Sequence, residues 1–525
     1  MQHTIDVHRV FAEYFTGVEA LAYAVSTALE EGSICLDTGE YLSTMGNVES
    51  AEQKNPFWKN AADFRKQMQE GRFVAMHPAV LKPFMVYGSR VYLQRYFHYE
   101  TLILEQIAKP GNHFRIITGG PGTGKTYGVA QELVRQYEQN PALKVAMAAP
   151  TGKAAARLNE SIRKFAQDNN LSDELRQKLR SQKARTLHGL LGYQHNSVFF
   201  RYHREHPLPF DVLVVDEASM IDGPLMAKLL DATGDHTQLF LLGDKDQLAS
   251  VEAGSVFGDI CRAKDCSLLK DRIEVKTKNW RAKDYPQIIA LSEKIIGGDA
   301  AYVQSLSPNE QVVIDTAYHE ALFNEHAALY LNYVYQDSIE GALKALDDIR
   351  FLCVTREHDR SVKETNKKIE AYLKAKVNDP SLFSPKPGFY HNQPILITQN
   401  NRELNVYNGD TGLVRKDPQT DVFYAWFASD EGGLRKIPAG YLSHFETVFA
   451  MTIHKSQGSD FDHVVVLLPE KRGGKLLTRE LLYTGVTRAR KKVVLQATPT
   501  MLEKCISTSV SRASGLTERL QSASL

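Results

Sequence analysis

The run Gly119-Gly120-Pro121-Gly122-Thr123-Gly124-Lys125-Thr126 follows directly on the apolar segment HFRIIT, and a segment with helical spacing, YGVAQELVRQY, comes after it. A strand, a glycine loop and a helix start are the context in which the pattern GxxxxGK[ST] binds phosphate. The glycines let backbone N–H groups point at phosphate oxygens, and the helix N-terminus adds a favourable dipole. Lys125 brings a positive charge to the β and γ phosphates, and Thr126 offers its hydroxyl to Mg²⁺. The sequence therefore predicts a site for ATP and Mg²⁺.

An acidic pair lies at the end of a second apolar run, about 90 residues further along the chain. Val212–Val215 reads as a buried strand, and Asp216 and Glu217 follow it. We expect Asp216 to hold Mg²⁺ together with Thr126, and Glu217 to orient or deprotonate the attacking water. A kinase must keep water out, whereas a hydrolase needs such a carboxylate. The pair predicts hydrolysis of the nucleotide.

Short apolar runs recur along the chain between longer amphipathic stretches. Runs of this kind, rich in β-branched residues and separated by helical segments, are typical of parallel strands joined by crossover helices. They fall into two groups, which predicts two α/β domains in tandem. The runs are Phe114–Thr118, Val145–Ala149, Val212–Val215 and Leu239–Leu242, then Phe351–Val354, Val464–Leu468 and Val493–Leu495.

The rest of the chain is organised around these two groups. The amino-terminal part reads as mostly helical, with a helix over Val18–Glu31 and a hairpin over Phe84–Leu93. A stretch with Gly, Asn and aromatic residues (NVYNGDTGLV, then DVFYAWF) reads as a small β-rich insertion. We expect an amino-terminal domain at 1–105, a first α/β domain at 106–275, a second at 276–400 and 446–525, and the insertion at 401–445.

Three polar residues are suited to a cleft between the two α/β domains. Gln247 follows the strand LFLLGD and is placed to bridge the γ-phosphate and the neighbouring domain. Arg281, in Asn279-Trp280-Arg281, and Arg488, in TRAR, are placed to neutralise charge that develops on the γ-phosphate. An isolated arginine is more often solvated at the surface, so this assignment depends on the phosphate loop that lies opposite.

Several long segments resemble, in content and in order, those of superfamily 1 helicases. More narrowly, they look like the RecD subunit, or alpha chain, of bacterial exodeoxyribonuclease V (RecBCD). The likeness covers about residues 114–525, and ALAYAVSTALEEGSICL and SRVYLQRYFHYE extend it more weakly into residues 1–105. The segments are GGPGTGKT, APTGKAAARL (149–158), TLHGLLG (186–192), VVDEASM (214–220), GDKDQLASVEAGSVFGDI (243–260), AMTIHKSQGSDFDHVVV (450–466) and LLYTGVTRARKKV (481–493).

The resemblance implies two tandem RecA-like P-loop domains with an SH3-like insertion, and a 5′→3′ translocase or helicase on single-stranded DNA. It also implies action at DNA ends, in double-strand break repair and recombination, beside a RecB-like subunit that holds the nuclease and a RecC-like subunit. Residues 1–105 would be the docking domain. No clustered carboxylates with a lysine stand out beyond the ATPase motifs, so no nuclease site is assigned to this chain.

Adenine recognition is the one place where the chain departs from this pattern. RecD-like helicases usually carry a helix with an adenine-reading glutamine upstream of the glycine loop. Only LILEQIAKPGNHF precedes the first strand here, and Gln106 lies closer to the loop than the pattern requires. The sequence therefore leaves the selectivity for the nucleotide base and the docking of the first domain open.

The DNA track is expected to cross the strand ends of both α/β domains. Thr151 and Lys153 follow a strand in the first domain, and Thr452, His454 and Lys455 hold a comparable place in the second. Contacts of this kind neutralise phosphates without reading bases, as a motor that passes every sequence requires.

Two further features are open to more than one interpretation. His188, in TLHGLL, lines the track or is a histidine satisfied within the fold. Residues 193–206, YQHNSVFFRYHREH, form a hairpin that stacks bases or splits a duplex, or an ordinary surface connection.

Composition excludes several classes of protein. Lys plus Arg is 63 and Asp plus Glu is 62, so a net charge of +1 permits only a local basic track. Of the five cysteines only Cys261 and Cys266 lie close together, which favours buried free thiols over a metal cluster. The amino terminus is unlike a secretory signal and no apolar run reaches about 18 residues. We expect a cytoplasmic protein with no membrane partner.

Other functions fit these motifs less well. A P-loop ATPase that remodels protein would not join PTGKAA-like and HKSQGS-like strand ends to its arginines. A non-enzymatic subunit is disfavoured because the hydrolysis residues are intact, and RNA is disfavoured by the resemblance alone. A free-standing superfamily 1 helicase without RecB or RecC partners is the main alternative, and an exposed apolar patch on residues 1–105 would argue for docking instead.

Overall fold

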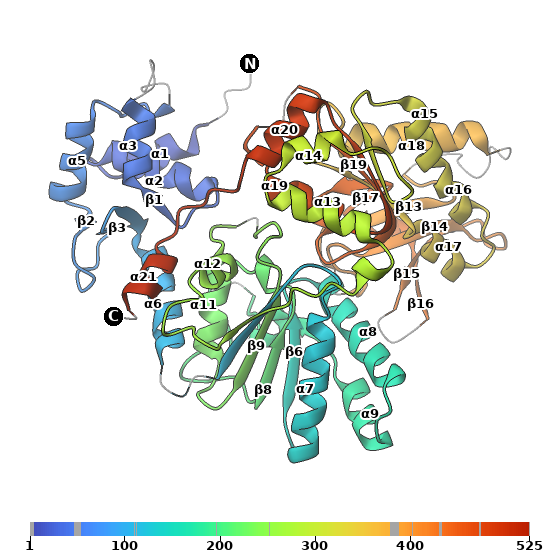
Figure 1. The fold of residues 1–525 in the computed structure, drawn as a ribbon, viewed down its shortest axis with the longest axis horizontal. Helices are drawn as coiled ribbons and strands as arrows, with labels where there is room; N and C mark the ends of the chain where they lie inside the picture. The colour runs from blue at the N-terminus through green and yellow to red at the C-terminus, as the bar shows by residue number, and fades with distance from the viewer. Residues whose placement is uncertain are drawn as a thin grey trace.

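Two parallel β-sheets form the frame of the molecule, and the nucleotide motifs lie where they face each other. In the computed structural model the first sheet lies below the second, and an amino-terminal part lies beside both (Figure 1). The residues that the structure describes are 5–46, 54–109, 111, 113–195, 197–250, 252–377, 388–401, 403–429, 433–471 and 474–523.

The first sheet has six parallel strands in the order β10-β5-β9-β8-β6-β7. Its inner strands are continuous apolar runs because helices cover both faces. The predicted runs in this region are strands β5, β6 and β8 and part of β9. The bounds are β5 Phe114–Thr118, α7 Lys125–Gln139, β6 Val145–Ala149, α8 Gly152–Asp168, α9 Asp173–Ser181, β7 Arg185–Thr186, α10 Leu187–Leu191, β8 Val212–Val215, α11 Gly223–Ala232, β9 Gln238–Gly243, α12 Val256–Arg262 and β10 Ile273–Val275.

The second sheet has five parallel strands in the order β11-β20-β19-β12-β18. The three runs predicted here correspond to β12, β19 and β20. The predicted α/β fold with two parallel sheets is therefore confirmed. The bounds are α13 Pro286–Ile296, α14 Ala300–Ser305, β11 Val312–Asp315, α15 Glu320–Ala327, α16 Leu331–Val334, α17 Ile339–Leu346, β12 Ile349–Cys353, α18 Val362–Lys376, β18 Ala450–Thr452, β19 Phe461–Leu467, α19 Arg479–Val486, β20 Ala489–Gln496 and α20 Pro499–Ser507.

An antiparallel sheet is inserted between β12 and β18 in the chain, with the order β16-β15-β14-β13-β17. The sheet begins at β13, before the predicted start at 401. The prediction missed this strand because QPILI is a fully buried run that resembles a strand of the parallel sheet. The bounds are β13 Gln393–Ile397, β14 Thr411–Lys416, β15 Phe423–Ala428, β16 Leu434–Pro438 and β17 Phe445–Thr447.

The amino-terminal part combines helices with a four-stranded sheet of order β1-β4-β3-β2. The predicted helix and the predicted hairpin are present as α2 and as the antiparallel pair β3–β4. The bounds are α1 Val7–Glu13, α2 Glu19–Glu30, β1 Cys35–Asp37, α3 Thr38–Gly46, α5 Ala61–Glu70, β2 Val74–Ala75, β3 Phe84–Tyr87, β4 Arg90–Leu93 and α6 Gln94–Ala108.

Two segments cross the predicted domain boundaries. Helix α6 runs through the boundary at 105, because its apolar side packs into the core of the first sheet. The last helix, α21 Leu516–Ser522, leaves the second sheet and packs beside α6 and α12, and Leu516 and Leu520 join the same core (Figure 1). Both segments therefore join the amino-terminal part to the first sheet.

All five cysteines are buried and free, as predicted. Within the described ranges, the helices are too short or too polar to cross a membrane.

Candidate nucleotide and nucleic-acid site

The phosphate loop connects β5 to α7 and packs tightly against a later segment of the chain. Gly124 caps α7 with φ of 76°, and Gly122 has φ of 81°, values that other residues rarely adopt. A Cβ atom on Gly122 would lie 2.9 Å from the Cβ of Arg281 and 2.9 Å from Oδ1 of Asn279. The Asn279 side chain donates a hydrogen bond to the carbonyl of Pro121 at 2.9 Å. The loop conformation thus depends on glycine and brings Arg281 next to the loop.

Lys125 begins α7, and its ammonium group is turned back onto the loop. The group donates hydrogen bonds to the carbonyl oxygens of Gly119 and Gly120, and the Thr123 hydroxyl donates to Gly120 at 2.8 Å. These bonds keep the charge at the mouth of the loop. A phosphate that binds there replaces backbone carbonyls as the partner of Lys125.

Asp216 and Glu217 follow β8 directly, at the carboxyl edge of the sheet. The Thr126 hydroxyl donates to Oδ2 of Asp216 at 3.5 Å, and Oδ1 accepts from the backbone N–H of Glu217 at 2.9 Å. Glu217 has φ of 52°, a strained value for a residue with a side chain. Burial raises the pKa of Asp216 to about 6, and the charge of Glu217 adds to the rise.

The oxygen atoms of Thr126 and Asp216 fit Mg²⁺, which uses few protein ligands and takes the rest from phosphates and water. Among the described residues, no group of three or more His, Cys, Asp or Glu side chains is arranged to hold a metal alone. A metal bound here would therefore rely on the nucleotide for the rest of its coordination.

The end of β9 links the first sheet to the second. Gln247 donates to Asp244 at 3.1 Å, and the hydroxyl of Tyr483, on α19, donates to the same carboxylate at 3.0 Å. The backbone N–H of Leu248 donates to the Thr484 hydroxyl at 2.9 Å. The residue predicted to sense the γ-phosphate is thus bonded into the contact between the sheets.

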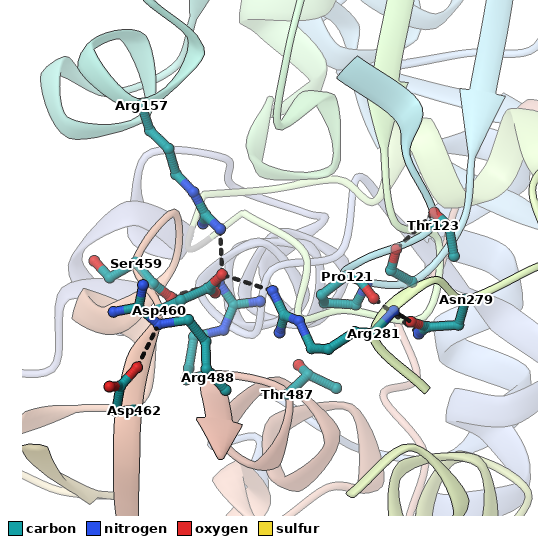
Figure 2. Close-up of polar contacts among 12 residues, drawn as sticks. Pro121, Thr123, Arg157, Asn279, Arg281, Ser459, Asp460, Asp462, Thr487 and Arg488 are labelled. Carbon is teal, nitrogen blue, oxygen red and sulfur yellow. Dashed lines mark hydrogen bonds and ion pairs between the residues drawn. The ribbon is translucent and has the colours of Figure 1, made fainter. Parts of the chain in front are cut away.

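Three arginines converge on Asp460, as Figure 2 shows. Arg157 comes from α8, Arg281 from the connection between the sheets, and Arg488 from the turn between α19 and β20. Oδ2 of Asp460 accepts hydrogen bonds from Arg157 and, at 2.9 Å, from Arg281, and Oδ1 lies 3.9 Å from Nη1 of Arg488. Burial raises the pKa of Asp460, but the three positive charges outweigh it and hold the pKa at about 2. The carboxylate is therefore ionised.

One cavity, with a volume of about 310 Å³, gathers most of the predicted nucleotide residues. Gly119 and Gly120 lie outside its lining and contact it through Lys125, and Arg281 reaches it through Asp460. The lining residues are Pro121, Gly122, Thr123, Gly124, Lys125, Thr126, Tyr127, Ala154, Arg157, Ser161, Lys164, Phe165, Asp168, Asp216, Glu217, Gln247, Asp460 and Arg488.

Arg157 and Asp460 are among the lining residues that the sequence analysis did not single out. Both lie inside recognised segments, APTGKAAARL and HKSQGSDFD. The sequence signal for each residue was a charged side chain next to apolar residues that were expected to be buried. Each segment contains more than one charged side chain. The packing of the two sheets determines which of them points into the cleft, and the sequence does not show that packing.

The two threonines predicted for DNA occupy matching positions. Thr151 follows β6, and its hydroxyl accepts from the backbone N–H of Ala154 at 3.2 Å. Thr452 ends β18, and its hydroxyl accepts from the backbone N–H of Lys455 at 3.2 Å. Each therefore closes a three-residue turn at the carboxyl edge of its own sheet.

The two lysines predicted for DNA both have partners. Lys153 lies 5.8 Å from the centre of the Phe461 ring, and burial lowers its pKa. Lys455 forms an ion pair with Glu446, and the same carboxylate pairs with Arg356. DNA would have to compete with Glu446 for Lys455.

The two histidines differ in environment. Burial lowers the pKa of His454, and Arg512 lowers it further. His188 is exposed on α10, and its ring lies 5.7 Å from that of Phe200 and 6.4 Å from that of Tyr193. Both are therefore unlike a freely solvated histidine.

Residues 193–206 fold back on themselves, apart from residue 196, which lies outside the description. Antiparallel bridges join Tyr193 to Phe200 and His203 to His206. Val198 and Phe199, near the tip, are 75% and 76% exposed. The segment thus presents an apolar tip to solvent.

Gln106 is remote from the nucleotide cavity. It lines a small separate cavity with Leu230, Asp235 and Leu239. Leu239 lies at the amino end of β9, whereas the nucleotide cavity lies at the carboxyl end. Gln106 therefore lies away from the cavity that holds the predicted phosphate-binding residues.

Comparisons with known proteins show which sequences and structures this chain is similar to. A sequence model of the AAA domain matches residues 105–253, and one of the UvrD-like helicase C-terminal domain matches residues 447–496. The chain is similar to the RecBCD enzyme subunit RecD of Mycobacterium tuberculosis, with 35% identity over 96% of this chain and 91% of that one. It is also similar to the ATP-dependent RecD2 DNA helicase of Deinococcus radiodurans, with 27% identity over 74% of this chain and 47% of that one. A solved structure of Pif1 helicases at forked duplex DNA matches with a TM-score of 0.40 and 18% identity, over 77% of this chain and 92% of that one.

Proposed function

The chain belongs to the RecD family of RecBCD enzyme subunits, and on this basis we propose that it is the ATP-dependent DNA helicase motor of such an enzyme. One observation supports the proposal most strongly. Lys125 and Asp216 of the first sheet and Arg488 of the second line a single cavity between the sheets. A nucleotide bound there touches both sheets, so its hydrolysis changes how they are held together.

The roles of the cavity residues follow from their positions. Lys125 would bind the β and γ phosphates, and Thr126 with Asp216 would hold Mg²⁺, which neutralises phosphate charge. Glu217, on its strained turn, would orient the attacking water. Gln247 would report the γ-phosphate through Asp244, and Arg281 and Arg488 would stabilise the charge that develops during hydrolysis.

Single-stranded DNA is proposed to run along the carboxyl edges of both sheets. Thr151 and Thr452 close equivalent turns there. These turns, with Lys153 and Lys455 beside them, would contact the phosphates. Alternate gripping at the two turns, driven by opening and closing of the nucleotide cavity, gives directional movement. Movement from 5′ to 3′ is proposed from the family resemblance alone.

The domain division is proposed in the same way. The two parallel sheets would be tandem RecA-like domains, and the antiparallel sheet over residues 393–447 an SH3-like insertion. Helix α1 and the residues that flank it expose apolar side chains, which are Ile5, Val7, Val10 and Tyr14, the last 76% exposed. Such a surface is suited to docking a RecC-like or RecB-like subunit. We place the assembly in the cytoplasm, where chromosomal DNA ends are repaired.

A free-standing DNA helicase is the alternative, and the similarity to the RecD2 helicase favours it. Coverage argues against it, because the chain spans 91% of the mycobacterial RecD but only 47% of that RecD2 protein. Co-purification with RecB-like and RecC-like subunits, compared between the parent chain and a Val10→Asp/Tyr14→Asp variant, distinguishes the two.

ATP hydrolysis by the purified chain, with and without single-stranded oligonucleotides, tests the motor itself. We expect DNA to stimulate hydrolysis and Lys125→Gln to abolish it, since the charge that binds the phosphates is lost. Oligonucleotides with a block at the 5′ or 3′ end then give the direction. Hydrolysis that is robust but indifferent to DNA would refute the motor and favour a protein-remodelling ATPase.

A further inference from the structure

Asp460 is surrounded by more positive charge than a structural ion pair needs. Its side chain is only 7% exposed, and three guanidinium groups from three separate segments face it (Figure 2). A buried carboxylate needs a partner, but one arginine in good geometry suffices. The excess of two positive charges lies at the wall of the nucleotide cavity, between the two sheets.

Three polar atoms near the same wall lack hydrogen-bond partners among the described residues. Oδ1 of Asp460, Nη2 of Arg488 and Oε1 of Gln247 are buried, and no group in the described structure forms a hydrogen bond with them. Arg488 is 1% exposed and Gln247 7%. Buried polar atoms without partners are costly, so their clustering at one cavity indicates a place built for a polar ligand.

We propose that Asp460 is a positioning residue that stands in for the terminal phosphate of ATP among the three arginines, and that Arg157 is a third phosphate-binding arginine, supplied by the first sheet. The inference rests on the proposed ATP site. Before nucleotide binds, the Asp460 carboxylate keeps the guanidinium groups together despite their mutual repulsion. The γ-phosphate, with its larger charge, then competes with Asp460 for Arg157 and Arg281.

The arrangement predicts a difference between ATP and ADP. ADP has no terminal phosphate and leaves the pairs between Asp460 and the arginines in place. ATP must break or share them. Asp460 therefore weakens the binding of ATP relative to ADP, and it recovers the arginines once the γ-phosphate has left.

Equilibrium binding of ADP and of a non-hydrolysable ATP analogue to Asp460→Asn tests this. We expect the preference for the analogue over ADP to rise about tenfold, the effect of removing one competing charge-assisted hydrogen bond. We expect kcat to fall, because the variant lacks the carboxylate that pairs with the arginines again after the γ-phosphate has left. An unchanged preference overturns the stand-in role of Asp460.

Arg157→Ala tests the second half of the proposal and does not depend on the folding of the Asp460 variant. The preference for the analogue should fall about tenfold, with ADP binding unchanged, and Arg157→Lys should restore part of it. Equal weakening of both nucleotides would mean that Arg157 acts only by joining the sheets.

Asp462→Asn is the matched control. Asp462 lies on β19, two positions after Asp460, and pairs with Arg490 at 3.1 Å and Lys491 at 2.7 Å, outside the cavity lining. It should leave the preference unchanged. If the parent chain binds neither nucleotide, the ATP site itself is refuted. Normal binding and hydrolysis with unchanged preferences in the variants refutes only the present inference.

Discussion

Tyr483 donates its hydroxyl hydrogen to Asp244 across the contact between the two sheets, at 3.0 Å. Both residues are buried, and burial raises the pKa of the carboxyl and of the phenol. Asp244 also accepts a hydrogen bond from Gln247. One carboxylate thus connects the residue proposed to sense the γ-phosphate with helix α19, which leads directly to Arg488.

Tyr483→Phe should uncouple ATP hydrolysis from DNA. The ring keeps its packing, but Asp244 loses a donor worth about 1 kcal/mol. We expect the stimulation of kcat by single-stranded DNA to fall about fivefold, with the KM for ATP changed less than about twofold. Tyr330→Phe is the control, since that hydroxyl is bonded to Phe449 and Ile349 within the second sheet. A raised KM with intact stimulation would place Tyr483 in nucleotide binding instead.

Asp216 should make Mg²⁺ binding depend on pH. Its pKa is raised to about 6, chiefly by burial, so protons compete with the metal below that pH. Mg²⁺ affinity should fall about tenfold for each pH unit below about 6. Stabilisation of the ADP-bound chain by Mg²⁺ in thermal unfolding, measured from about pH 5 to pH 8, reports this. A Mg²⁺ effect that is constant over the range would contradict it.

The same residue predicts a stability effect of the opposite sign without metal. A carboxyl whose folded pKa is raised favours folding at low pH, and this contribution is lost as pH rises through about 6. In Mg²⁺-free buffer Asp216→Asn should therefore unfold at a higher temperature than the parent at about pH 8, and the gain should shrink towards about pH 5.

The sequence predicted what depends on local pattern. Apolar runs located seven of the eleven strands in the two parallel sheets and missed β7, β10, β11 and β18, which are short or less apolar. The glycine loop and the acidic pair, predicted to form the nucleotide site, line one cavity. The prediction failed where the sheet or core that a segment joins depends on contacts with distant parts of the chain. The apolar run QPILI is compatible with a strand of the parallel sheet and with a strand of the insertion. The apolar side of α6 predicts that the helix is partly buried but does not identify the core that it joins. Arg157 and Asp460 meet only because the sheets pack, over 300 residues apart in the chain.

Glu446 should weaken DNA binding, because its carboxylate forms ion pairs with Lys455 and Arg356 and competes with DNA phosphates for them. Glu446→Gln frees both cations for phosphates, so we expect single-stranded DNA to bind about three- to tenfold more tightly, with a steeper dependence on salt. Fluorescence anisotropy of a labelled oligonucleotide over a salt series measures both. Asp235→Asn, which breaks an exposed pair with Lys109, is the control. Unchanged affinity would show that DNA does not reach Lys455.

Phe199 should matter for separating strands and not for hydrolysis. Its side chain lies near the exposed tip of residues 193–206 and supports no core. Phe199→Ala should leave DNA-stimulated ATP hydrolysis within about twofold and lower the unwinding of a forked duplex about tenfold, because base stacking is worth about 1–3 kcal/mol. Val275→Ala, another exposed apolar residue, is the control. Equal unwinding by Phe199→Ala and the parent would favour an ordinary surface connection.

Arg519 should hold the amino-terminal part against the motor. Glu100, on α6, is fully buried and accepts hydrogen bonds from Ser514 and Gly515 at 3.0 Å and from Arg519 at 3.3 Å. Arg519→Ala leaves that carboxylate buried without its cation, a change that typically costs about 3–5 kcal/mol.

We therefore expect Arg519→Ala to lower the thermal transition and to expose the segment around α21 in hydrogen exchange, while ATP binding at the distant cavity persists. Glu100→Gln/Arg519→Met removes both charges together and should recover most of the loss. Glu518→Gln, which breaks a pair whose carboxylate is 61% exposed, should have little effect. If Arg519→Ala and Glu518→Gln behave alike, the buried pair does not fasten the carboxyl-terminal helix, and apolar contacts of Leu516 and Leu520 alone hold it in place.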